Sequence, residues 1–267
     1  MVELKVLGAI GRKVSGTFLF SDSEKRIQRP RIFFCHIPKC AGSSIVSAVR
    51  NKLYPNCANG TFEIEQAPSK RSARSVGKPM MELRENILAY NLALDRNYFG
   101  HGHSYCRPEL VKEFLVDWDF VTILRDPVER WISEYVYNTF KEGDWAKNTM
   151  SLEQYLDSKK GLFTGRYLLH YFSNESRCSG FAPEQYVTEA LDNLSRFSVV
   201  GTLDRLDQWS NDMIRRYGVT LKIPKKNASP RSEVAEEISS DSKLVKKIER
   251  LCKYDLEVYN RVLDRIY

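Results

Sequence analysis

The sequence predicts an α/β protein, an open parallel sheet flanked by helices on both faces in three α/β/α layers. Two observations favour this class. Short apolar segments with the character of strands alternate with segments of helical periodicity, and this alternation is typical of a parallel sheet with helical connections. The sequence also has no break in composition and no internal repeat. We therefore expect a single domain over residues 1–267.

Composition excludes several classes of protein. The 267 residues include 41 Lys and Arg against 34 Asp and Glu, a net charge of +7, and 42% of them are hydrophobic; this is the composition of a globular protein. The basic residues are not clustered as in a nucleic-acid-binding arm. No apolar run approaches the ~18 residues of a membrane span, and Glu3, Lys5 and Arg12 interrupt any signal peptide. We expect a cytoplasmic protein with no nucleic-acid partner; a trimmed lumenal domain is the alternative.

In the first half of the chain, a buried strand is the clearest element. Residues 31–36 are apolar and end before Pro38, as expected of a short core strand. Residues 54–80 are rich in Pro, Gly and Asn, which favours a loop. The basic residues of this segment are interleaved with Ser and Ala, and we expect this part of the loop to be mobile. The other expected elements are an edge strand at 17–20, a helix at 42–50, a strand at 97–101 and a helix after Pro108. The basic residues of the loop are Lys70, Arg71, Arg74 and Lys78.

The second half contains the best-marked helix start. Asp126 and Pro127 follow an apolar strand at 119–124 and suit the N-cap and the first helical position. Ser151 and Gln154 have the spacing of a capping box. The remaining expected elements are a helix at 183–197, a strand at 197–201, a helix at 203–217, a loop at 222–230 and a final helix from 233 onward.

A candidate phosphate loop follows the first strand. Segment 36–44 reads HIPKCAGSS and joins a strand to a helix, where backbone N–H groups form an anion site. Lys39 adds a positive charge. The nucleotidase P-loop, G-x-x-x-x-G-K-[ST], places its lysine directly after the second glycine, but Ser43 stands there in this chain. A P-loop-type sheet is therefore expected, while hydrolysis of ATP with Mg²⁺ is disfavoured.

A second candidate anion site follows the strand at 119–124. Segment 125–135 reads RDPVERWISEY, and Arg125 leaves the sheet at the edge where open α/β sheets bind ligands. Ser133 lies two turns into the helix. A forked guanidinium and a hydroxyl suit a second, separate phosphate.

Together, the two segments resemble the cofactor signatures of sulfotransferases that use 3′-phosphoadenosine 5′-phosphosulfate (PAPS), and are most similar to the branch of the heparan sulfate 2-O- and 6-O-sulfotransferases. The resemblance implies that Arg125 and Ser133 hold the 3′-phosphate and that no metal is needed. It implies that the first loop holds the 5′-phosphosulfate, with Cys40 where the family commonly has Thr. It also suggests that Asn227, Ser229 and Arg231 close over the nucleotide. The implied residues of the first loop are Lys39, Cys40, Ala41, Gly42, Ser43 and Ser44.

A third segment supplies a candidate base. Residues 99–105 read FGHGHSY, similar to the segment that carries the catalytic histidine of the 2-O-sulfotransferases. The resemblance implies that His103 is the general base and His101 its neighbour. Independently, an imidazole with a pKa near 6.5 suits removal of an acceptor proton at neutral pH. We expect structural or orienting roles for His36 and His170.

The acceptor stays open at this stage. A small molecule or a carbohydrate that offers a hydroxyl or an amine fits the resemblance, and segments 54–96 and 139–182 are expected to shape its pocket. The oligomeric state is also open. Two other functions remain possible: a P-loop kinase or nucleotidase, and a non-catalytic protein that binds polyanions through its basic loop.

Overall fold

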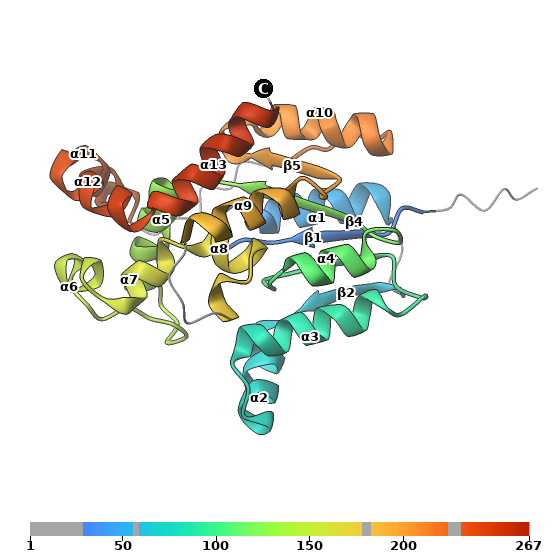
Figure 1. The fold of residues 1–267 in the computed structure, drawn as a ribbon, viewed down its shortest axis with the longest axis horizontal. Helices are drawn as coiled ribbons and strands as arrows, with labels where there is room; N and C mark the ends of the chain where they lie inside the picture. The colour runs from blue at the N-terminus through green and yellow to red at the C-terminus, as the bar shows by residue number, and fades with distance from the viewer. Residues whose placement is uncertain (1–28, 56–58, 178–182, 224–230, 267) are drawn as a thin grey trace, which may run out of the picture.

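Five strands form the central sheet, in the order β2-β3-β1-β4-β5 (Figure 1). The computed structural model describes residues 29–55, 59–177, 183–223 and 231–266. All neighbouring strands run parallel, so their carboxyl ends meet at one edge of the sheet. The strands are β1 (Ile32–Cys35), β2 (Thr61–Ile64), β3 (Phe99–Gly102), β4 (Asp119–Leu124) and β5 (Val199–Thr202).

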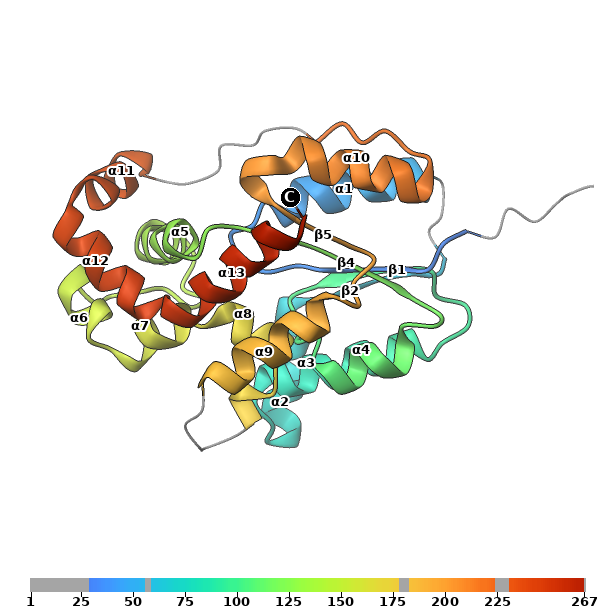
Figure 2. The ribbon, with the colours of Figure 1, turned by 45° about the horizontal axis from the view of Figure 1, so that its top comes forward.

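Helices cover both faces of this sheet, which confirms the predicted three-layer α/β/α fold (Figures 1 and 2). Helices α1 and α10 lie on one face, and α4 and α9 lie on the other. The first seven helices are α1 (Gly42–Leu53), α2 (Gln66–Val76), α3 (Met80–Leu92), α4 (Pro108–Phe114), α5 (Pro127–Phe140), α6 (Leu152–Leu156) and α7 (Lys159–Thr164). They are followed by α8 (Tyr167–Phe172), α9 (Pro183–Leu194), α10 (Leu206–Tyr217), α11 (Ser232–Ser240), α12 (Ser242–Leu251) and α13 (Lys253–Ile266), with short 3₁₀ turns at Glu175–Arg177 and Leu203–Arg205.

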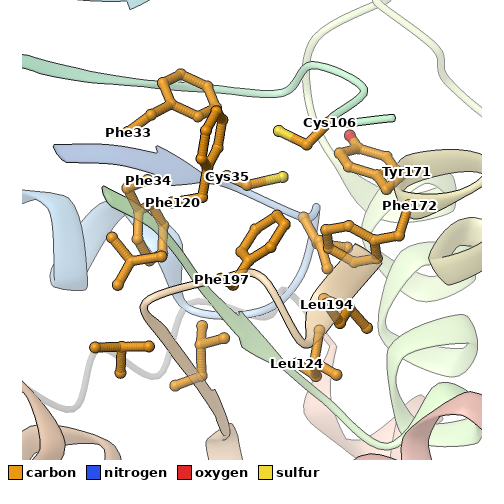
Figure 3. Close-up of a cluster of buried hydrophobic side chains, with 14 of the residues drawn as sticks. Phe33, Phe34, Cys35, Cys106, Phe120, Leu124, Tyr171, Phe172, Leu194 and Phe197 are labelled. Atoms are coloured by element: carbon orange, nitrogen blue, oxygen red, sulfur yellow. The ribbon is translucent and has the colours of Figure 1, made fainter. Parts of the chain in front are cut away.

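Aromatic packing between the strands and helices forms the core. Strand β1 is buried along its whole length and β4 from Phe120 onward. The Phe33 and Phe120 rings meet edge to face at 6.2 Å, and Phe197 packs on Phe120 at 5.6 Å (Figure 3). Burial of each such side chain contributes about 1.5–3 kcal/mol. The strands therefore form a rigid support for the loops that leave β1 and β4.

The best-marked helix starts are confirmed. Asp126 caps α5, and its carboxylate accepts hydrogen bonds from the N–H groups of Val128 and Glu129. The capping box of Ser151 and Gln154 opens α6. Helix α5 then buries Trp131 in a second apolar cluster, formed with α6, α11 and α12 beyond the carboxyl edge of the sheet. The other expected elements in the described part of the chain are present with small shifts of their ends.

The expectation of a loop over residues 54–80 is wrong, because this segment contains β2 and α2. Its loop signals have helical explanations. Pro68 lies in the first turn of α2, where its missing N–H has no helical partner to lose. Gly77 ends the helix in the left-handed conformation, with φ of 65°, as helix C-caps commonly do. The basic residues Lys70, Arg71 and Arg74 are therefore helical.

The expected single C-terminal helix is also wrong, because the chain forms α11, α12 and α13 there. Asp241 interrupts it with an extended backbone, and its side chain accepts from the N–H groups of Lys243 and Leu244 to start α12. The expected edge strand at 17–20 and residues 224–230 of the expected loop lie outside the described residues.

Candidate functional site

A cavity of about 1000 Å³ opens at the carboxyl edge of the sheet. The loops after β1 and β3 form its floor, and α3, α5 and α8 contribute side chains to its walls. This is where open α/β sheets bind their ligands. A cavity of about 670 Å³ lies beside β5 and is lined by α9, α10 and α13, but none of the predicted site residues lines it.

The loop after β1 bends sharply before α1. Lys39 and Ala41 both have left-handed backbone conformations, with φ of 68° and 55°, which are uncommon outside glycine. Ala41 is the N-cap of α1 but supplies no side-chain cap, and the first turn contains no acidic residue. The first N–H groups of a helix end of this kind suit an anion, although the N–H of Ser44 already donates to the carbonyl of Ala41 at 3.2 Å.

Most of the predicted loop residues line the cavity, but Cys40 does not. The Cys40 side chain is fully buried, and burial raises the pKa of its thiol to about 12. Glycine at position 42 has a steric explanation, because a Cβ there would lie 2.0 Å from the His36 ring. The predicted residues that do line the cavity are Lys39, Ala41, Gly42, Ser43 and Ser44.

The ammonium group of Lys39 lies 3.7 Å from the centroid of the Tyr137 ring, a cation–π contact. Among the described residues, no carboxylate lies within ion-pair distance of it. Burial lowers the Lys39 pKa, and Glu134 partly opposes this effect. Lys39 thus presents an unpaired positive charge at the cavity.

Arg125 lies next to this loop, and Ser133 lies on α5; neither residue lines the cavity. The Arg125 Nη1 donates a hydrogen bond of 3.3 Å to the carbonyl of Lys39, and its Nε lies 3.2 Å from Glu129. Ser133 is 8% exposed on α5. The structure therefore links the loop after β4 to the loop after β1, with Arg125 at the junction.

The two histidines of the FGHGHSY segment separate at the end of β3. His103 lines the cavity, whereas His101 does not and instead lies 3.8 Å from Glu63. A regular strand would place both on one face, but Gly102 has φ of 151° and turns the chain between them. A Cβ at Gly102 would lie 2.7 Å from the Cβ of Ile64.

A hydrogen bond determines the tautomer of His103. Its Nδ1 lies 2.6 Å from the carbonyl oxygen of His36, and because a carbonyl can only accept, Nδ1 carries the proton. The lone pair is then on Nε2. Burial lowers the His103 pKa, partly opposed by this hydrogen bond, so the ring is neutral at neutral pH.

Several lining residues escaped sequence reasoning. Glu134 lines the cavity from α5, and Lys141 lines it from the position directly after this helix. Glu134 follows Ser133 in the segment 125–135, which could have identified it. Glu134 accepts a hydrogen bond of 3.1 Å from the Tyr167 hydroxyl. Arg84 lies on α3, in a segment without a recognisable motif.

The remaining predicted residues lie away from the cavity or outside the described chain. Arg231 is the N-cap of α11 and has φ of 61°; its guanidinium lies 5.8 Å from the Phe140 ring. Asn227 and Ser229 lie outside the described residues. His170 is buried and lies 2.6 Å from Glu175, which agrees with its expected structural role.

Two further searches covered only the described residues. They contain no group of three or more His, Cys, Asp or Glu side chains that could hold a metal ion. None of their helices combines the length and the hydrophobicity needed to cross a bilayer.

A comparison with models of protein families gives a match. The model of the Sulfotransferase family covers residues 26–260, which include the sheet, the loops after β1, β3 and β4, and the cavity. No curated protein matches the sequence significantly. Since the family model spans most of the chain, this protein belongs to the Sulfotransferase family.

Proposed function

We propose that this sulfotransferase moves the sulfuryl group of PAPS in line to a hydroxyl or amine of a small-molecule or carbohydrate acceptor, and releases 3′-phosphoadenosine 5′-phosphate (PAP). One observation carries the proposal. The neutral His103, whose Nδ1 is bonded to the His36 carbonyl, lines the same cavity as the uncapped end of α1. A base and an anion site in one cavity are the two groups that such a transfer requires.

The residues present fit PAPS. The N-terminus of α1 has neither a side-chain cap nor an acidic residue, so its N–H groups are open to a phosphate. The absence of a Cβ at Gly42 makes room for the His36 ring, which a Cβ would meet at 2.0 Å. PAPS supplies a sulfuryl group that is already activated on a phosphate leaving group. No metal is part of the proposal, as in the family that the motifs resemble.

His103 acts as the general base. Its Nε2 takes the proton of the acceptor as the acceptor oxygen or nitrogen bonds to sulfur and the bond from sulfur to the phosphate oxygen breaks. The Nδ1–H keeps its hydrogen bond to the His36 carbonyl oxygen, and this hydrogen bond stabilises the imidazolium that forms. General-base catalysis of this kind contributes about 10²–10⁴-fold to the rate.

Lys39 and the α1 N-terminus stabilise the leaving phosphate. The Lys39 ammonium has no carboxylate partner in the described chain, and residues 41–44 line the cavity at the start of α1. Both are in place before the reaction, so no reorganisation is needed as negative charge develops. His101 does not line the cavity, so its proposed supporting role is indirect.

Arg125 and Ser133 are proposed to recognise the 3′-phosphate. The Arg125 guanidinium already contacts the Lys39 carbonyl, so it lies beside the proposed phosphate loop. The likeness to the heparan sulfate 2-O- and 6-O-sulfotransferases is part of the same proposal. It is supported by the HIPKCAGSS loop and by His103.

The direct test is transfer from labelled PAPS to a panel of glycans, phenols, alcohols and amines. The His103→Asn variant should lose about 10²–10⁴-fold in kcat, because Asn can keep the hydrogen bond to His36 but cannot act as a base. Its affinity for PAP, measured by calorimetry, should stay within about twofold. An equal loss of PAP affinity would contradict the base role, and no transfer to any acceptor would contradict the function.

A further inference from the structure

Strand β5 is an open edge of the sheet. It pairs with β4 alone, and the described residues contain no strand on its other side. In a parallel pair, the N–H and C=O groups of alternate residues point to the neighbouring strand, and those of the others point away from it. No other described residue makes a hydrogen bond to the backbone of Val199–Thr202. An open edge of this kind is a template for a further strand.

The cavity of about 670 Å³ lies along this open edge and is called the edge groove below. Helix α10 lines it on one side of the sheet, and α9 and α13 line it on the other (Figure 2). An extended chain paired with β5 would lie about 4.8 Å from it, within this space. The floor of the edge groove is apolar and consists of Leu191, Leu194, Phe197, Val199, Val200 and Val262.

Three arginines form the rim of the edge groove. Arg215 and Arg216 lie in the last turn of α10, and Arg265 lies in the last turn of α13. The first two pair with Asp212 and Asp119. Arg265 donates a hydrogen bond of 3.3 Å to a backbone carbonyl of α9 and has no carboxylate partner among the described residues. The rim therefore favours a ligand with acidic groups.

The chain itself contains a segment with matching chemistry. Residues 17–24 read TFLFSDSE, an apolar run followed by two acidic residues, and lie outside the described residues. The apolar half of this segment is the edge strand that the sequence predicts at 17–20. An apolar floor with a basic rim is the surface that complements such a segment.

The segment is tethered close to the edge groove. The N–H of Asp119 donates a hydrogen bond of 2.7 Å to the carbonyl of Arg31. The carboxylate of Asp119 in turn contacts Arg216 and Ser198, and both of these residues line the groove. The stretch from residue 24 to residue 29 can span about 17 Å, and two strand spacings of roughly 10 Å in total separate β1 from β5. The tether is therefore long enough to place the acidic half at the rim.

We propose that residues 17–24 bind in the edge groove as an additional strand beside β5. Backbone hydrogen bonds join the apolar half to the open edge, and its side chains point in turn to the two helical layers. Asp22 and Glu24 pair with the arginines of the rim. Because the rim lies at the amino end of β5, the added strand runs antiparallel to β5. This inference does not depend on the proposed sulfotransfer.

Hydrogen exchange followed by NMR at the amides of Val199–Thr202 tests the proposal on the full chain. In the wild-type protein, all of these amides should exchange slowly. Phe20→Asp would bring a charge to the apolar floor, so it should speed exchange of the amides that point away from β4 by about tenfold or more. The amides of β1 should keep their protection. Val6→Asp makes the same kind of change outside the segment and is the matched control.

Two outcomes of this experiment would overturn the proposal. The amides that point away from β4 could exchange as fast in the wild-type protein as in Phe20→Asp, which would mean that the edge is open. Alternatively, Val6→Asp could speed their exchange while Phe20→Asp does not, which would mean that another part of the chain covers β5.

Charge reversal tests the rim separately. The double variant Asp22→Lys, Glu24→Lys should speed exchange at the same amides by about two- to fivefold, because the new lysines repel the arginines. Adding Arg265→Glu should reverse part of this effect. Unchanged exchange in the double variant would contradict the pairing. Protection that rises with protein concentration, together with a dimer in analytical ultracentrifugation, would mean that a second copy covers β5 and would overturn the proposal.

Discussion

The loop after β1 has no room for a side chain at Gly42. A Cβ at residue 42 would lie 2.0 Å from the His36 ring. That ring cannot move away easily, because it is packed on the His103 ring with centroids 4.2 Å apart. A substitution at Gly42 would therefore disturb the phosphate loop and the proposed base together.

Gly42→Ala should destabilise the protein by about 1–3 kcal/mol, the usual cost of overpacking, although Ala normally favours a helix. PAP affinity and kcat should fall with it. Thermal unfolding and calorimetry measure both effects. Gly143→Ala is the matched control, because a Cβ there meets nothing within 4 Å. If Gly42→Ala has the thermal stability and the PAP affinity of the wild-type protein, the loop can accommodate a Cβ and the prediction is wrong.

The pKa of His103 predicts the pH dependence of the reaction. Burial lowers this pKa from its ordinary value of 6.5, and a general base must be neutral. We therefore expect kcat/KM to be constant above pH 6.5, the ordinary pKa of a histidine, and to fall only at lower pH. A profile against pH of kcat/KM for the acceptor, at saturating PAPS, tests this. A rise in activity through about pH 8 would point to another base.

At the residue scale, the segment that sequence reasoning selected for its backbone chemistry lies at the cavity. It predicted a phosphate loop at 36–44, and seven of these nine residues line the cavity. It could not separate His101 from His103, because the turn at Gly102 depends on the contact with Ile64 across the sheet. Arg84 also escaped, since it lies in a segment without a recognisable motif and lines the cavity only in the folded chain.

Among the helices, α8 is tied to α13 by a buried carboxylate. Asp255 accepts hydrogen bonds of 2.8 and 3.2 Å from the N–H groups of Leu168 and Leu169 at the start of α8. Burial raises the pKa of Asp255 to about 7, although these hydrogen bonds oppose the rise. The folded protein therefore holds this proton more tightly than the unfolded chain, where the pKa is near 3.8.

The pH dependence of the free energy of unfolding follows from this difference between the folded and unfolded pKa of Asp255. The stabilising contribution of the bound proton is complete at low pH and is lost as pH rises through about 7. Between pH 6 and pH 8, the wild-type protein should lose on the order of 1 kcal/mol that Asp255→Asn does not lose. Urea unfolding of both proteins at the two pH values measures this difference. The histidines contribute equally to the pH dependence of both proteins, so their contributions cancel. Parallel changes would contradict the raised pKa.

At the scale of elements, local sequence signals predicted the starts of helices better than they predicted the secondary structure of whole segments. Asp126 and Ser151 cap their helices as expected, because a cap depends only on neighbouring residues. Helix α2 was missed because Pro68 and Gly77 are typical of loops as well as of helix ends. The edge strand β2 is only partly buried, so it lacks the continuous apolar pattern that identified β1 and β4.

For the whole molecule, the net charge of +7 favours encounter with polyanionic ligands, but only a few cations lie near the cavity. Among the described residues, Lys39, Arg84 and Lys141 line it, and Arg125 lies at the junction of the two loops. A nucleotide with phosphates at both ends would contact the loops after β1 and β4 together. Its binding should therefore stabilise the fold as a whole.

PAP should raise the melting temperature more than adenosine 5′-phosphate, which lacks the 3′-phosphate. At a PAP concentration of 100 times Kd, the stabilisation should be about 2.7 kcal/mol. Arg125→Ala should remove most of the difference between the two nucleotides, because it removes the proposed partner of the 3′-phosphate. Arg250→Met, which removes a charge from the exposed part of α12, should leave it intact. Differential scanning calorimetry measures these shifts. If PAP and adenosine 5′-phosphate stabilise the wild-type protein equally, the loop after β4 does not recognise a second phosphate.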